Sequence, residues 1–223
     1  MAGERALVIG ASGGIGSALA EALEGRGVAV TRLSRTADGL DVTDEASVEA
    51  ALAPLEGPFA RIVIATGALA AAGATPEKTI RELDPAALAA QFAVNAIGPA
   101  LVLKHVWRLI PRDRPSVTAV LSARVGSIGD NRLGGWYSYR AAKAAVNQLV
   151  HTAAIELARS HREAVLVALH PGTVATSFTA DYAGRHKTVP PAEAAANLLT
   201  VIDSLTPADT GRFFDWKGDP VPW

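Results

Sequence analysis

The chain has 223 residues, with 21 Lys or Arg against 22 Asp or Glu, and 49% of its residues are hydrophobic. This composition excludes a disordered chain and suffices for a domain with its own core. The balanced charge argues against nucleic acid as a partner, because neutralising phosphates requires clustered cations. The chain has no Cys, which excludes disulfides and thiolate chemistry and fits the reducing cytoplasm, where we expect the protein to reside.

Two apolar stretches resemble membrane or export signals. Residues 85–103 carry no formal charge, but they contain Gln91, Asn95 and a Gly98-Pro99 pair, so we expect a helix buried in a soluble protein. The apolar stretch of residues 6–20 is interrupted by a glycine cluster, which a signal peptide does not explain. We therefore expect no membrane partner.

Short β-branched runs alternate with Ala- and Leu-rich segments along the whole chain, which is typical of βαβ units around a parallel sheet. The runs predict strands at residues 5–9, 28–33, 61–65, 117–121, 164–169 and 212–215. The segments predict helices at residues 15–25, 44–53, 85–110, 138–159 and 191–204. No linker divides the chain, so the pattern predicts one α/β domain over residues 1–223. We expect a doubly wound Rossmann-type fold with a parallel sheet of about seven strands and helices on both faces.

A glycine-rich turn, Gly10-Ala11-Ser12-Gly13-Gly14-Ile15-Gly16, follows the first predicted strand. Gly10 permits a tight exit from the strand, Gly14 lets the backbone approach a ligand, and Gly16 allows close packing of helix on sheet. The helix that follows presents unpaired N–H groups and the positive end of its dipole to an anion. The order of strand, turn and helix therefore predicts a pyrophosphate site.

The same turn also matches the Gly-x-Ser-x-Gly pattern of a hydrolase nucleophile elbow, with Ser12 as the nucleophile. In such a hydrolase the oxyanion loop follows an earlier strand, and too few residues precede Ser12 to form one. None of the five His residues has a recognisable acid–base context, and they are not spaced as a ligand cluster. We therefore do not expect a hydrolase, and we expect no metal.

The end of the second predicted strand indicates which dinucleotide is bound. An acidic residue there accepts from the ribose 2′-hydroxyl in NAD binders, whereas this chain has Ser34-Arg35. A guanidinium cannot accept a hydrogen bond, but it pairs well with a 2′-phosphate. The sequence thus favours NADP(H) over NAD(H), although Asp38 remains an alternative acceptor. Asp41 and Val42 are the next expected contacts, to the adenine.

Tyr139 stands four residues before Lys143 at the start of a long predicted helix, so both side chains lie on one face. A phenol with a pKa of ~10 is a weak acid at neutral pH, but a nearby ammonium favours its phenolate and makes proton exchange with an alcohol or carbonyl feasible. Tyr137 lacks this arrangement, because its partner four residues on is Ala141.

Taken together, these motifs resemble the short-chain dehydrogenase/reductase superfamily over essentially the whole chain, and most closely the carbonyl-reductase branch with the C-factor and Sniffer-type proteins. The matching motifs are the glycine turn, Asp41-Val42, Val94-Asn95-Ala96, Tyr139-Arg140-Ala141-Ala142-Lys143 and Pro171-Gly172-Thr173-Val174-Ala175-Thr176. The resemblance implies an NADP-dependent oxidoreductase that interconverts an alcohol with a ketone, aldehyde or quinone. It also implies a homodimer or homotetramer assembled through the helices at 85–110 and 138–159.

The resemblance implies specific roles for these residues. Tyr139 would exchange a proton with the substrate oxygen while a hydride passes between the nicotinamide and the carbonyl carbon. Lys143 would hold the nicotinamide ribose and stabilise the Tyr139 phenolate, and Asn95 would hold a water that relays protons to Lys143. The residues expected to contact the cofactor are Gly10, Ser12, Gly13, Gly14, Ile15, Gly16, Ser34, Arg35, Asp41, Val42, Ala65, Thr66, Gly67, Asn95, Tyr139, Lys143, Pro171, Gly172, Thr173, Val174 and Thr176.

Three departures from the family pattern bear on the site. Ile9 replaces the usual Thr before the first glycine, and Ala65-Thr66-Gly67 replaces Asn-Ala-Gly, with Thr66 as the candidate substitute for the asparagine. Ala123 falls where the catalytic serine is usual, so Ser122, or else Ser127, is expected to hold the substrate oxygen. These changes leave open an alternative function, a catalytically weak dinucleotide-binding sensor or signalling protein.

The substrate pocket is expected between residues 123–136 and residues 177–187. Four aromatic residues there would form an apolar wall suited to a hydrophobic carbonyl compound: Trp136, Tyr137, Phe178 and Tyr182. The C-terminal residues 220–223 are expected either to cap an interface or to fray.

Overall fold

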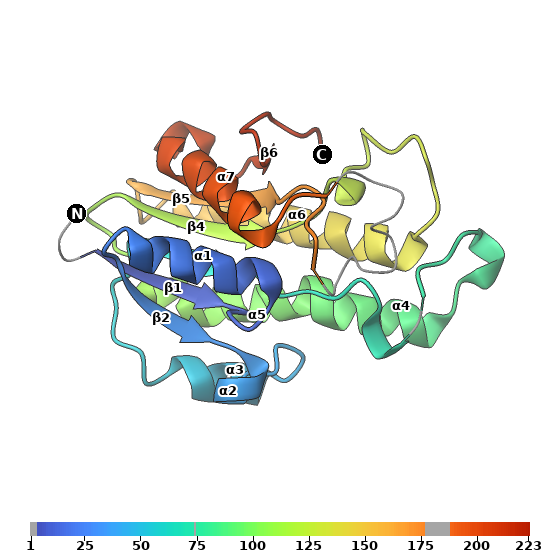
Figure 1. The fold of residues 1–223 in the computed structure, drawn as a ribbon, viewed down its shortest axis with the longest axis horizontal. Coiled ribbons are helices and arrows are strands. Elements are labelled where there is room, and N and C mark those ends of the chain that lie inside the picture. The colour runs from blue at the N-terminus through green and yellow to red at the C-terminus, as the bar shows by residue number, and fades with distance from the viewer. Residues whose placement is uncertain (1–3, 74, 177–187) are drawn as a thin grey trace.

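The computed structural model describes residues 4–73, 75–176 and 188–223. Its described residues form one parallel sheet of six strands in the order β2-β1-β3-β4-β5-β6 (Figure 1). The strands are β1 (Arg5–Ile9), β2 (Ala29–Leu33), β3 (Arg61–Ile64), β4 (Ser116–Leu121), β5 (Ala164–His170) and β6 (Phe213–Asp215). The predicted fold class is confirmed, with one strand fewer in the described sheet than the expected count of about seven.

The helices are α1 (Gly14–Gly25), α2 (Arg35–Asp38), α3 (Glu45–Leu52), α4 (Pro85–Phe92), α5 (Gly98–Val106), α6 (Tyr137–Leu157) and α7 (Pro191–Ser204). The prediction of one continuous helix over residues 85–110 is wrong. A π-helical turn, Ala93–Ile97, separates α4 from α5, and a 3-10 turn follows α5. Pro99 has no N–H to donate to the carbonyl of Asn95, which interrupts the α-helical ladder at this point.

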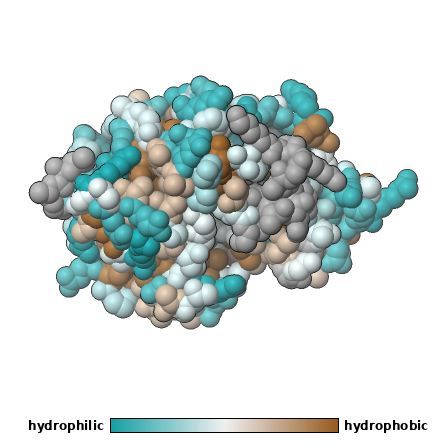
Figure 2. All heavy atoms as spheres, viewed as in Figure 1, coloured by the Kyte–Doolittle hydropathy of each residue, from teal (hydrophilic) through white to brown (hydrophobic). Residues whose placement is uncertain are grey.

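Two apolar cores lie on the two faces of the sheet. Residues alternate along β1, so that Leu7 and Ile9 pack on one face and Ala6 and Val8 on the other. The first core includes buried residues of α3, α5 and α6, and the second includes buried residues of α1 and α7. Figure 1 shows α1 and α7 in front of the sheet with α5 and α6 behind it. The face seen in Figure 2 mixes hydrophilic and hydrophobic residues.

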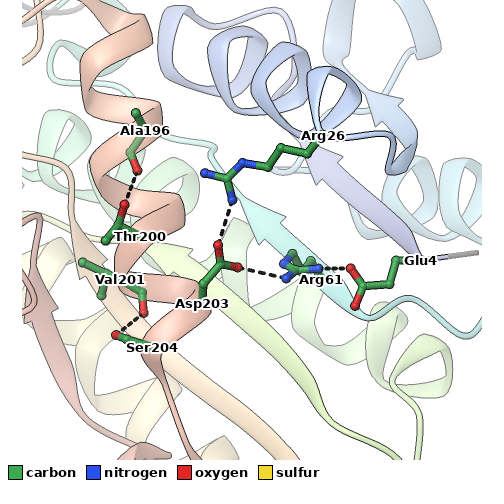
Figure 3. A network of polar contacts seen from close by, with 8 residues as sticks. All are labelled: Glu4, Arg26, Arg61, Ala196, Thr200, Val201, Asp203 and Ser204. Carbon is green, nitrogen blue, oxygen red and sulfur yellow. Dashed lines mark hydrogen bonds and ion pairs between the residues drawn. The ribbon is translucent and has the colours of Figure 1, made fainter. Parts of the chain in front are cut away.

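An ion-pair network ties α1, α7 and β3 together near the amino ends of the strands (Figure 3). Asp203 of α7 accepts from Arg26 at 2.7 Å and from Arg61 of β3 at 2.9 Å. Arg61 also pairs with Glu4, just before β1. These pairs are partly exposed, so they fix the relative placement of the elements more than they stabilise the fold.

The segment Pro85–Leu109 is long and apolar enough to cross a membrane by length and composition alone, and 39% of its most apolar window is buried. Its inner face nevertheless belongs to the first core through Val102, Leu103 and Val106. We expected this segment to be buried, but the structure buries only part of it and leaves the Ile97 side chain half exposed.

Candidate functional site

The site lies at the carboxyl ends of β1 and β3, where the strand order reverses from β2-β1 to β3-β4. Ligands of open parallel sheets bind at such a switch point. A cavity of about 600 Å³ opens here. Its described walls are Gly13, Gly14, Ile15, Gly16, Arg35, Ala65, Thr66, Gly67, Ala68, Leu69, Ala70, Thr75, Pro76, Leu121, Ser122, Ala123, Tyr139, Lys143, His170, Pro171, Gly172, Val174 and Thr176.

Most of the residues expected to contact the cofactor thus line one cavity. Those outside its described walls are Gly10, Ser12, Ser34, Asp41, Val42, Asn95 and Thr173. Val42 is buried and packs against Gly98, where a Cβ would come within 2.7 Å of its Cγ2 atom. The carboxylate of Asp41 accepts from the backbone N–H and the hydroxyl of Thr43, and these bonds lower its pKa. Both side chains thus make local contacts, and their expected contacts with the adenine stay a prediction.

The glycine turn is built by steric exclusion. Gly10 has a φ of 87°, and a Cβ there would lie 2.7 Å from the carbonyl oxygen of Ala65. A Cβ on Gly16 would lie 2.2 Å from the carbonyl oxygen of Gly10, so the turn and the first helical turn can meet only without side chains. A Cβ on Gly14 would clash with Thr176 at 2.6 Å. The absence of a side chain at Gly14 therefore lets the glycine turn contact the loop after β5, in addition to the expected approach of the backbone to a ligand.

The amino end of α1 is open to the cavity. Gly13, its N-cap, supplies no side-chain hydrogen bond, and the first turn holds no acidic residue. The N–H groups at the start of a helix attract an anion. Two buried polar atoms on the cavity wall, Thr66 Oγ1 and His170 Nδ1, also have no hydrogen-bond partner among the described residues. Open N–H groups and orphaned polar atoms fit a dinucleotide with its pyrophosphate on α1.

The residues that follow β2 include both candidates for contact with the adenosine ribose, Arg35 and Asp38, and their hydrogen bonds differ. The Asp38 carboxylate accepts from the N–H of Ser34 at 2.7 Å, and the Ser34 hydroxyl accepts from Ala37 as the cap of α2. Arg35 is exposed and lines the cavity, and its guanidinium makes no hydrogen bond to the described part of the chain. The Asp38 carboxylate is therefore used within its own turn, whereas the Arg35 guanidinium can bind a ligand in the cavity.

Tyr139 and Lys143 are both buried on the face of α6 that lines the cavity. The Lys143 Nζ lies 5.9 Å from the centre of the Tyr139 ring and donates to the carbonyl of Leu121 at 3.1 Å. Burial lowers the pKa of Lys143 to about 8 and raises the pKa of the Tyr139 phenol. In this structure desolvation therefore shifts the pKa of Tyr139 in the direction opposite to the lowering expected from Lys143.

Asn95 lies in the π-helical turn and is fully buried. Its Oδ1 accepts from the N–H of Ala68, and its Nδ2 donates to the carbonyl of Ala68 and to Gln91. One amide hydrogen thus holds the loop after β3, and the other holds Gln91 of α4. The side chain has no further N–H to donate to a relay water, and the expected relay role of Asn95 stays a prediction.

The two candidate serines differ in position. Ser122 lines the cavity at the end of β4, and its hydroxyl donates to Oδ1 of Asn147 on α6 at 2.6 Å. Ser127 is outside the described cavity walls, and its hydroxyl donates to the carbonyl of Pro222. Of the two, Ser122 is the one that lines the cavity, with its proton engaged by Asn147, while Ser127 anchors the C-terminal residues.

The C-terminal residues are packed on the protein. The carbonyl of Trp223 accepts from Gly129 at 2.8 Å, and the Trp223 ring stacks on Phe213 at 5.8 Å. Of the two alternatives for these residues, fraying is therefore wrong, and capping of an interface stays a prediction.

The loop after β5 also lines the cavity, beside the glycine turn. Gly172 has a φ of 80°, and a Cβ there would lie 3.0 Å from the ring of Trp216. Of the four predicted substrate-wall aromatics, Trp136 and Tyr137 are half-buried, whereas Phe178 and Tyr182 lie outside the described residues. The described residues contain no group of three or more His, Cys, Asp or Glu that could hold a metal.

Sequence reasoning missed three polar residues at or behind the cavity: Glu77, Asn147 and His170. Asn147 had a signal, because it follows Lys143 at helical spacing. His170 directly precedes the Pro171-Gly172 pair, and burial lowers its pKa to about 4, so it is neutral at pH 7. Glu77 had no local signal, because its contacts lie 61 residues away.

Comparison with known proteins finds a matching family model and similar chains. A family model described as enoyl-(acyl carrier protein) reductase matches residues 10–213. The chain is 34% identical to 1-hydroxy-2-glutathionyl-2-methyl-3-butene dehydrogenase of Rhodococcus sp. (strain AD45), covering 97% of this chain and 98% of that protein. It is 37% identical to C-signal of Myxococcus xanthus, covering 64% of this chain and 82% of that protein. The structure of NADPH-bound carbonyl reductase from chicken fatty liver superposes with a TM-score of 0.82 at 23% identity, covering 99% of both chains.

Proposed function

Because the chain belongs to the short-chain dehydrogenase/reductase family of oxidoreductases, we propose that it is an NADP(H)-dependent enzyme that interconverts a ketone, aldehyde or quinone with an alcohol. The observation that carries the proposal is the burial of Tyr139 and Lys143, side by side, on the wall of the cavity that begins at the glycine turn. A binding protein has no chemical need for a phenol beside an ammonium.

The chain's own residues would divide the work as follows. The nicotinamide dinucleotide, when bound, supplies or accepts the hydride. Tyr139 is protonated at neutral pH, since a phenol has a pKa of ~10 and burial raises that of Tyr139 further, so it would donate its phenolic proton to the substrate oxygen during reduction. Lys143 would hold the nicotinamide ribose through its ammonium, and Ser122 would accept or donate a hydrogen bond at the substrate oxygen.

The preference for NADP(H) rests on Arg35. Its exposed guanidinium faces the cavity, where it can pair with a 2′-phosphate, while the Asp38 carboxylate is held by Ser34. The structural relative from chicken is described with NADPH bound, which supports the same choice.

Two measurements test the proposal. NADPH oxidation is followed with a panel of hydrophobic aldehydes, ketones and quinones, with an enoyl thioester as a separate class. Thermal unfolding is compared with NADPH and with NADH. The proposal requires turnover of a carbonyl compound and a larger increase in Tm with NADPH. Failure of both cofactors to raise Tm would contradict dinucleotide binding itself.

A second candidate function is a dinucleotide-dependent sensor or signalling protein. It is favoured by Ala123 at the usual position of the catalytic serine and by the hydrogen bond that engages the Ser122 hydroxyl with Asn147. The chain is also similar to a protein named C-signal, and that name supports this second function. Stabilisation by NADPH without turnover of any class in the panel would favour this function.

We also propose a cytoplasmic homodimer or homotetramer. Ile97, Leu149 and Ile155 are 50%, 40% and 51% exposed, respectively, on the helical segments expected to pair. Apolar side chains in this position are covered when two copies of the chain associate.

A further inference from the structure

Glu77 lies in the loop after β3, beside Thr75 and Pro76 of the cavity wall, and is only 7% exposed. Its carboxylate accepts from the backbone N–H of Ser138 at 3.2 Å and from the Ser138 hydroxyl. The backbone carbonyl of Glu77 accepts from the N–H of Trp136. One loop residue thus holds the start of α6 through both its side chain and its backbone.

The start of α6 needs such support. Gly134, Gly135 and Trp136 have φ values of 64°, 67° and 53°, and Trp136 is the one non-glycine residue with a positive φ in the described chain. A bulky side chain in this conformation persists only where its surroundings enforce it. Trp136, the N-cap of α6, supplies no side-chain cap. The Glu77 carboxylate takes over the capping role from a distant loop, where the helix dipole also favours a negative charge.

The carboxylate is ionised in this position. Burial raises the pKa of Glu77, but the hydrogen bonds from Ser138 and from the backbone N–H of Glu77 together outweigh burial and hold the pKa below its ordinary value.

The support reaches the proposed general acid in two ways. Ser138 directly precedes Tyr139 in α6, and the Trp136 ring meets the Tyr139 ring edge-on, with centroids 6.2 Å apart and planes at 67°. We propose that Glu77 is a positioning residue that holds Tyr139 in its reactive orientation and joins the Thr75-Pro76 wall of the cavity to α6. This inference rests on the proposed function, because it assigns Tyr139 the proton transfer.

The test compares Glu77→Ala, Glu77→Gln and Ser138→Ala with the wild type. Glu82→Ala is the matched control, because Glu82 lies on the same loop and its carboxylate, among the described residues, accepts from the exposed N–H of Lys78 alone. We measure kcat and the KM for NADPH in carbonyl reduction, and amide hydrogen exchange of residues 136–140. The exchange experiment needs no turnover. It therefore still tests whether Glu77 holds the start of α6 if the proposed reaction is not observed.

Glu77→Ala is expected to lower kcat by about tenfold or more with a KM for NADPH within about twofold, because small displacements of a reacting group are costly. Glu77→Gln is expected to recover most of kcat, since its amide can still accept from the Ser138 N–H and donate to the hydroxyl. The exchange rate of the Ser138 amide should rise in Glu77→Ala and remain at the wild-type rate in Glu82→Ala.

Three results would overturn the proposal: a kcat within about twofold of wild type in Glu77→Ala, an unchanged exchange rate at Ser138, or equal losses in Glu77→Gln and Glu77→Ala. Should Glu77→Ala fail to fold, Ser138→Ala decides in its place, because it removes the side-chain contact and leaves the N–H bond. Its kcat should then lie between those of the wild type and an inactive enzyme.

Discussion

Burial dominates the ionisation of the two side chains proposed for proton transfer. The Lys143 ammonium sits in a poorly solvated site with one hydrogen bond to Leu121, and its pKa falls to about 8. The Tyr139 phenol is buried as well, and its pKa rises. The pair is therefore best suited to reduction at neutral pH, with the phenol as the acid and the lysine still charged.

A pH profile tests this assignment. The Lys143 ammonium is lost as the pH rises through about 8, so kcat/KM for carbonyl reduction is expected to fall above that pH, by about tenfold per unit for one proton. Tyr139 adds no loss in this range because its raised pKa keeps it protonated. Lys143→Arg, which retains its charge, should show no such decline in whatever activity remains. A wild-type profile that stays flat to pH 10 would contradict the assignment.

Arg35 is expected to select between the two cofactors. Arg35→Ala should weaken NADPH binding about tenfold, which corresponds to ~1.4 kcal/mol for an exposed charged hydrogen bond, and should leave NADH binding within about twofold. Fluorescence titration with both cofactors measures the effect. Arg32→Ala is the control, because Arg32 is paired with Glu24. Equal weakening of both cofactors by Arg35→Ala would mean that the guanidinium does not read the 2′-phosphate.

Features of the site that involve single residues were predictable where the interacting residues are close together in the sequence. The glycine turn and the Tyr139–Lys143 spacing were readable because strand, turn and helix geometry fix which residues share a face. The pKa of Tyr139 was not, because desolvation depends on everything packed around it. The Ser122–Asn147 bond also depends on the tertiary structure, since it joins β4 to α6.

At the scale of elements, the π-helical turn at Ala93–Ile97 connects the helical layer to the loop after β3. Asn95→Ala would remove the hydrogen bonds that Asn95 makes to the N–H and the carbonyl of Ala68 and to Oε1 of Gln91. We expect the free energy of unfolding to fall by about 2–3 kcal/mol. Urea denaturation checks the value against Gln148→Ala on the exposed face of α6. A loss below about 0.5 kcal/mol would contradict a structural role for this cross-link.

The extent of elements was predictable from hydrophobic period and from start signals such as Pro190-Pro191, which begins α7 at Pro191. The interruption at residues 93–97 escaped prediction because Ala, Val and Ile continue the apolar pattern through it. The Glu77 contacts escaped for another reason, because a cap supplied from a distant loop leaves no periodic trace in either segment.

For the whole molecule, self-association is expected through α6 and the segment around Ile97. Sedimentation should give a dimer or tetramer, and the double variant Leu149→Glu/Ile155→Glu should be a monomer, because two charges cannot be buried unpaired at a contact. Cofactor binding should persist in this variant, since neither residue lines the cavity. If the double variant keeps the oligomeric mass of the wild type, the interface lies elsewhere on the protein. If the wild type itself sediments as a monomer, the proposal of self-association is wrong.

The central claim is that Tyr139 transfers the proton in a nicotinamide-dependent carbonyl reduction. The most direct measurement is NADPH oxidation by Tyr139→Phe beside Tyr137→Phe, with NADPH affinity measured for both. Each change removes one hydroxyl from neighbouring positions of α6, but only Tyr139 lines the cavity. We predict that Tyr139→Phe loses turnover by at least about a hundredfold and binds NADPH within about twofold of wild type, while Tyr137→Phe remains active. Full turnover by Tyr139→Phe would contradict the claim.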